Sequence, residues 1–192
     1  MKSELHKKYS MYTANRRFGE NYKMRTYEYY SNVMKNADFT EKPCQFCGTK
    51  KDCLDGIYFE QSDVISVCLS CLDEKKIEVD IPDYIQNRIK NNVSAKFETL
   101  KYTPPIPWVQ YNDWQVCCDD YMKYIGEWEQ EDFINEAVDG DGINLLKHIL
   151  NEGTLSRVDD INVLWEDIGY DTVAYVFQCP ECGRKTVVCQ SY

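Results

Sequence analysis

The feature that most constrains this chain is the spacing of its cysteines, of which there are ten in 192 residues. Cys44 and Cys47 are separated by two residues, as are Cys68 and Cys71, and twenty residues lie between the two pairs. This spacing is typical of a tetrathiolate zinc site, because a tight turn within each pair directs both sulfurs at one ion. Four thiolates leave no position for water, so we expect a structural zinc ion worth about 10 kcal/mol of folding free energy.

A second knuckle, Cys179-Pro180-Glu181-Cys182-Gly183, lies between two predicted strands at residues 172–177 and 186–189. Its best candidate partners are Cys117 and Cys118. Neighbouring residues on a strand point to opposite faces, so these two can share an ion only at a bulge or a turn. The alternative is a single ligand from that pair and an incomplete site. We expect Cys53 and Cys189 to be core thiols.

The cellular compartment decides whether the cysteines are expected to bind metal or to form disulfides. The first nine residues are mostly polar and charged, so we expect no signal peptide and a cytoplasmic protein, where disulfides do not persist. No apolar run approaches the ~20 residues that a membrane span needs. A redox role for a C-x-x-C pair is disfavoured, because neither pair is expected to open a helix after a strand.

The pattern along the chain predicts an α+β fold, with small antiparallel β elements around two zinc knuckles and several helices. Residues 1–23 are expected to form an N-terminal extension, and residues 24–192 the domain. Within the domain we place a first zinc module at 44–71, and an acidic helical region with a closing zinc-ribbon hairpin at 111–192. Shorter elements are expected as strands at 25–30, 56–59 and 64–67, and as helices at 82–92, 126–138, 143–150 and 158–168.

The net charge of −10 is concentrated in one part of the chain. Residues 111–171 hold 16 acidic and three basic side chains, a local charge of −13. Such a surface repels phosphate and attracts cationic partners, so nucleic acid is an unlikely ligand and a basic protein is a better one. A solvated surface that only maintains solubility is the simpler alternative.

Catalytic constellations are missing from the sequence. The two histidines, His6 and His148, have no nucleophile or carboxylate at a suggestive spacing. The segment Asp139-Gly140-Asp141-Gly142-Ile143-Asn144 departs from a calcium-binding loop, because its glycine comes too early and no glutamate closes it. We therefore expect a protein that is not an enzyme.

Several blocks, in order, resemble the CbrC-like family of bacterial proteins, over roughly residues 24–192. The similar blocks are Arg25-Thr26-Tyr27-Glu28-Tyr29-Tyr30, the two C-x-x-C pairs at 44–47 and 68–71, Thr103-Pro104, Trp108-Val109-Gln110, Trp114-Gln115-Val116-Cys117-Cys118-Asp119, Ile125-Gly126, and residues 175–183. Two departures stand out. The Asp-Pro of the family is absent from Ser31-Asn32-Val33, and its central histidine is Cys117 here. A cysteine in place of that histidine keeps a zinc ligand.

The resemblance implies a cytoplasmic protein without established enzymatic activity, associated by name with tolerance to a colicin. Combined with the charge, it predicts a zinc-binding interaction protein whose acidic face binds a basic toxin. The first alternative is a zinc ribbon that binds nucleic acid or the transcription or translation machinery. The second is an enzyme with an open zinc position near Cys117 and Cys118. The metal ligands expected are Cys44, Cys47, Cys68, Cys71, Cys117, Cys118, Cys179 and Cys182.

Overall fold

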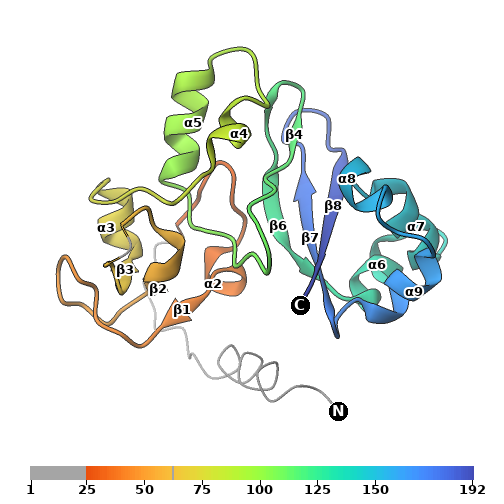
Figure 1. The fold of residues 1–192 in the computed structure, drawn as a ribbon, viewed down its shortest axis with the longest axis horizontal. Helices are drawn as coiled ribbons and strands as arrows, with labels where there is room; N and C mark the ends of the chain where they lie inside the picture. The colour runs from red at the N-terminus through yellow and green to blue at the C-terminus, as the bar shows by residue number, and fades with distance from the viewer. Residues whose placement is uncertain (1–24, 62) are drawn as a thin grey trace.

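The computed structural model describes residues 25–61 and 63–192, and it has an α+β architecture, as predicted. Within these residues the strands form three small antiparallel sheets, in the orders β1-β2-β3, β4-β5 and β6-β7-β8. The last sheet lies at the centre of the molecule, between the N-terminal module and a group of helices (Figure 1). The predicted extension at residues 1–23 lies outside the described residues.

The N-terminal module is built around a short three-stranded sheet. After the single turn of α2 (Val33–Asn36) come β1 (Phe39–Thr40), β2 (Cys53–Asp55) and β3 (Ser66–Cys68), followed directly by α3 (Leu69–Asp73). The predicted strand at 56–59 is wrong, because residues Gly56–Tyr58 form a 3-10 turn, η1, capped by the Asp55 carboxylate. The predicted strand at 25–30 is also wrong, since only Tyr30 forms a bridge, with Tyr124.

The middle of the chain departs most from the sequence-based expectation. Helix α4 (Asp83–Gln86) is much shorter than the predicted helix at 82–92, and α5 (Val93–Lys101) follows where none was predicted. Residues 87–92 separate the two helices, and Asn92, the N-cap of α5, has a left-handed backbone with φ 53°. Ile81, Ile85 and Ile89 are still buried, so the apolar pattern marked the core correctly while the helix assignment was too long.

The central sheet joins β6 (Lys123–Trp128) to the long hairpin of β7 (Thr172–Gln178) and β8 (Lys185–Ser191), which the sequence predicted. Alternate residues of β7 enter two separate hydrophobic cores. Tyr175 and Phe177 belong to the larger core, shared with the N-terminal module. Ala174 and Val176 belong to a smaller core on the other face of the sheet.

Helices cover that second face (Figure 1). They are α6 (Gln130–Glu136), α7 (Gly142–Ile149), α8 (Glu152–Leu155) and α9 (Ile161–Asp167). Helix α6 begins later than the predicted 126–138, because β6 continues through Trp128 and Glu129 caps the helix in a capping box with Asp132. Apolar side chains such as Phe133 and Leu146 fill the core beneath these helices.

In the described part of the chain, no helix is both long and apolar enough to cross a membrane.

Candidate metal centres

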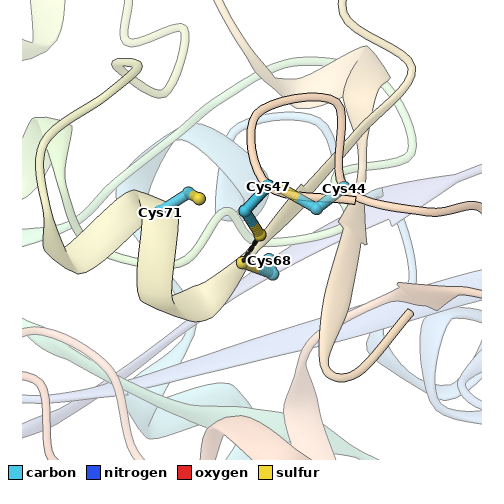
Figure 2. A group of neighbouring side chains, drawn as sticks. All are labelled: Cys44, Cys47, Cys68 and Cys71. Atoms are coloured by element: carbon cyan, nitrogen blue, oxygen red, sulfur yellow. Dashed lines mark hydrogen bonds between the residues drawn. The ribbon is translucent and has the colours of Figure 1, made fainter. Parts of the chain in front are cut away.

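The first cysteine group brings together the two pairs that the spacing predicts. Cys44 and Cys47 lie on the turn between β1 and β2, Cys68 ends β3, and Cys71 lies in α3. Figure 2 shows the loop pair and the helix pair facing one another. All four Sγ atoms lie within 4.8 Å of one another, so four sulfurs converge on one point.

The sulfur separations fit a shared ion better than a covalent bond. The Sγ atoms of Cys47 and Cys68 are 3.6 Å apart, and none of the ten cysteines is in a disulfide. A disulfide requires about 2.05 Å. In a tetrahedron with zinc–sulfur bonds of about 2.3 Å, neighbouring sulfurs are about 3.8 Å apart. The geometry therefore matches four ligands around one metal ion.

The turn that carries Cys44 and Cys47 has the hydrogen bonds of a compact knuckle. The Gly48 N–H donates to the Cys44 carbonyl at 2.8 Å, and the Cys44 N–H donates to the Thr49 carbonyl at 2.7 Å. Gly48 has φ +74°, and a β-carbon there would meet nothing within 4 Å. Space is available here for a side chain, so crowding does not explain the glycine. Glycine is favoured because the backbone at this position is left-handed.

The second knuckle repeats these bonds at the same offsets. The Gly183 N–H donates to the Cys179 carbonyl at 3.0 Å, and the Cys179 N–H donates to the Arg184 carbonyl at 2.8 Å. Gly183 has φ +73°. The Cys182 N–H also points at the Cys179 sulfur, at 3.5 Å. Two segments more than a hundred residues apart thus adopt one local structure.

Cys68 and Cys71 differ from both knuckles because they open a helix. Cys68 is the last residue of β3 and the N-cap of α3, and Cys71 lies one turn further on. The expectation that neither pair opens a helix after a strand is therefore wrong for Cys68 and Cys71. The redox interpretation is still disfavoured, because the sulfurs of Cys44 and Cys47 complete a group of four around them.

The pKa values of Cys44, Cys68 and Cys71 in the first group are strongly separated. Burial opposes ionisation of Cys44, but backbone N–H groups of Cys68, Cys47 and Phe46 outweigh it and lower its pKa to about 6. Burial and the neighbouring sulfurs raise the pKa of Cys68 to about 11, and they raise that of Cys71 further. Four crowded thiols cannot all ionise without a cation among them, and a divalent metal supplies that charge.

The second group joins the tips of two hairpins. Cys117 ends β4 (Val116–Cys117), and Cys179 and Cys182 lie on the turn between β7 and β8. Cys118 and Asp119 form the two-residue turn before β5 (Asp120–Tyr121), with φ values of 53° and 58°. Two positive φ values are the signature of a type I′ hairpin turn. The predicted condition for a shared ion, a turn at Cys117 and Cys118, is confirmed.

The four sulfurs of this second group also lie within 4.8 Å of one another. Cys117 Sγ is 3.6 Å from Cys182 Sγ and 3.8 Å from Cys118 Sγ, which again matches a tetrahedron. Backbone and side-chain hydrogen bonds, led by the Arg184 N–H, lower the pKa of Cys182 to about 7. The alternative of a single ligand from the Cys117/Cys118 pair does not describe this arrangement.

Asp119 holds the hairpin tip in place, a role that the sequence analysis missed. Its carboxylate accepts hydrogen bonds from the backbone N–H groups of Lys90 (2.6 Å) and Asn91 (2.9 Å) and from the Asn91 side chain (2.7 Å). Lys96 donates to the Asp119 carbonyl. The only signal in the sequence was an aspartate after a cysteine pair, which is compatible with many turns.

Other residues singled out in the sequence have different roles. Cys53 is buried, and its sulfur lies 3.3 Å from the Thr49 carbonyl, outside the first group. Cys189 is buried in β8, where burial raises its pKa to about 12. His148 is exposed and contacts the Asn144 carbonyl. In the segment 139–144, Asp141 caps α7 through the Asn144 N–H.

Comparison with known proteins finds a family that matches most of the chain. The model of a family described as Uncharacterised protein family (UPF0167) matches residues 24–190. No curated protein and no solved structure matches the chain. The match neither carries the CbrC-like name nor conflicts with it.

Proposed function

This chain belongs to Uncharacterised protein family UPF0167, whose description names no activity. From the two cysteine groups we therefore propose that it is a zinc-stabilised, non-enzymatic interaction protein. One observation carries the proposal. Eight of its ten cysteines lie in two groups, each with four sulfurs within 4.8 Å of one another. We also propose a reducing, cytoplasmic location, because metal thiolates persist there and disulfides do not.

Zinc is the metal that the ligand set favours. All-sulfur tetrahedral sites select zinc or iron over the hard cations magnesium and calcium, which prefer oxygen. Zinc thiolate sites are colourless, whereas iron–sulfur sites absorb visible light. Elemental analysis of protein purified under reducing conditions, together with an absorption spectrum, tests this assignment. Two zinc ions per chain and no visible band is the expected result.

Four protein ligands also support a structural role for the metal. A catalytic zinc ion keeps one position for water or substrate, and a set of four thiolates fills every position. The alternative of an enzyme near Cys117 and Cys118 needs at most three protein ligands there, and four sulfurs converge at that point. The closed set of ligands is therefore our reason for proposing that the protein is not an enzyme.

The proposed partner is a basic protein, and the charge distribution supports it. The local charge of −13 falls on residues 111–171, which include helices α6 to α9. Exposed apolar side chains, Ile134, Val138 and Val163, lie in the same region. Carboxylates among exposed apolar groups favour a protein partner with basic and apolar contacts. A basic toxin is the candidate that the resemblance adds.

Binding to a basic toxin encoded beside its gene tests this part of the proposal. We expect a complex at low salt that weakens as ionic strength rises, because the attraction is electrostatic. Replacing exposed carboxylates of the helices (E131Q/E152Q/E166Q) should weaken binding at least tenfold. The matched control, E41Q/E60Q/D63N, removes the same charge from the N-terminal module and should bind normally.

Two results would contradict the partner proposal. The first is no complex at low salt. The second is equal weakening by both triple variants, which would mean that only total charge matters. Tight binding of RNA or DNA with a steep salt dependence would instead favour the nucleic-acid alternative.

A further inference from the structure

Solvent access separates the two cysteine groups. In the first group Cys44, Cys68 and Cys71 are 2%, 1% and 1% exposed, and only Cys47 reaches the surface. In the second group only Cys179 is buried, while Cys118 and Cys182 are exposed. A thiolate must be reached by solvent before an oxidant can attack it.

The two groups also differ in how firmly the surrounding structure holds their cysteines. Cys47 has a sulfur 3.6 Å away on Cys68, but Cys68 is fixed in the larger core at the junction of β3 and α3. Cys117 and Cys182 are also 3.6 Å apart and lie at hairpin tips, where Cys117 is half-buried against the edge of the larger core and Cys182 is exposed. Disulfide formation needs an approach to about 2.05 Å, which two hairpin tips can make more easily than a buried strand end.

We propose that Cys182 is an oxidation site and that its oxidation releases the metal of the second group only. The proposal rests on the proposed metal binding. A peroxide oxygen is attacked by the Cys182 thiolate, the O–O bond breaks, and sulfenic acid and hydroxide form. The Cys117 thiolate then displaces hydroxide from that sulfur and forms a disulfide. Two electrons pass from two thiolates to one peroxide, and two protons complete two waters.

Loss of this ion leaves the rest of the fold supported. The β4–β5 turn is still held by Asp119 through Lys90 and Asn91. The β7–β8 hairpin is still paired along its length and packed between two cores. The second group is therefore a redox-sensitive link between two hairpin tips, and the first group is the permanent metal centre.

The test uses the full chain loaded with zinc and counted before oxidation. Two ions per chain at the start establish the proposed metal binding, and fewer than one would overturn that proposal separately. Hydrogen peroxide is then added in limiting steps while a colorimetric indicator records free zinc. Alkylation and mass spectrometry identify the oxidised residues at each step.

We expect one zinc ion per chain to leave first, together with a Cys117–Cys182 disulfide and an unchanged circular dichroism spectrum. The variant C117S/C182S should hold one ion and retain it over the same range of peroxide. The matched control C189S removes a buried thiol and should behave like the parent chain. Simultaneous loss of both ions, or a Cys47–Cys68 disulfide formed first, would overturn the inference.

Discussion

At the scale of single residues, substitution of a knuckle glycine tests the effect of backbone strain alone, because a side chain there would meet no crowding. Gly48 has a left-handed backbone with open space where a β-carbon would lie. Gly48→Ala should therefore destabilise the protein by about 1 kcal/mol, which lowers the melting temperature by roughly 2–4 °C. Gly153→Ala, in α8, is the matched control and should be neutral or stabilising by about 0.5 kcal/mol. Equal effects of the two variants would contradict this account of Gly48.

Two buried cysteines of the N-terminal module make a sharper comparison. Cys44→Ser removes a proposed metal ligand and should unfold the domain, because the ion contributes about 10 kcal/mol. Cys53→Ser leaves the group of four intact and replaces a thiol that lies 3.3 Å from the Thr49 carbonyl with another hydrogen-bond donor. It should cost about 1–2 kcal/mol and keep the full zinc content. Metal analysis and thermal melting distinguish these outcomes. A folded Cys44→Ser protein with unchanged zinc would contradict the assignment.

At the scale of elements, the β4–β5 turn depends on one carboxylate. Asp119→Ala removes the acceptor for three N–H groups and should weaken metal retention in the second group roughly tenfold, leaving the first group unchanged. Competition with a chelator measures both affinities. Asp139→Ala is the control, since Asp139 is an exposed aspartate that accepts the Asp141 N–H far from either group in the sequence. Parallel weakening in both variants would show that Asp119 has no special role.

Local spacing predicted the two cysteine groups better than it predicted the elements between them. The C-x-x-C spacing and the strands around the second knuckle are sufficient to predict which cysteines come together, because both depend on short-range geometry. The apolar positions Ile81, Ile85 and Ile89 predict one long helix, yet the irregular segment 87–92, which ends at the left-handed Asn92, divides the region. Helix α5 buries few apolar residues, chiefly Phe97 and Leu100, so its periodicity was weak.

The start of α6 shows a different limit. The acidic composition after Gly126 resembled a helix, whereas β6 continues to Trp128 through pairing with β7. Strand pairing is a tertiary contact that composition does not reveal. The role of Asp119 could not be predicted for the same reason, because its hydrogen-bond partners Lys90 and Asn91 are distant in the sequence.

At the scale of the whole molecule, the central sheet connects two cores, and only the larger core contains residues of the two cysteine groups. The first cysteine group lies within the larger core, which includes Cys44, Cys68 and Cys71 and extends to Phe177 on the sheet. The helices α6 to α9 pack on the other face through a separate core, whose buried members include one cysteine, Cys189. Metal loss from the first group should therefore disrupt the N-terminal module before it disrupts these helices.

The most direct test of the central claim is thermal unfolding measured before and after verified zinc removal under reducing conditions. We predict two zinc ions per chain at the start. We also predict that removing both lowers the melting temperature by more than 10 °C or abolishes the cooperative transition, because three of the four cysteines proposed to hold the first ion belong to the larger core. A metal-free protein that melts at the same temperature would contradict the claim that these cysteines hold a structural metal.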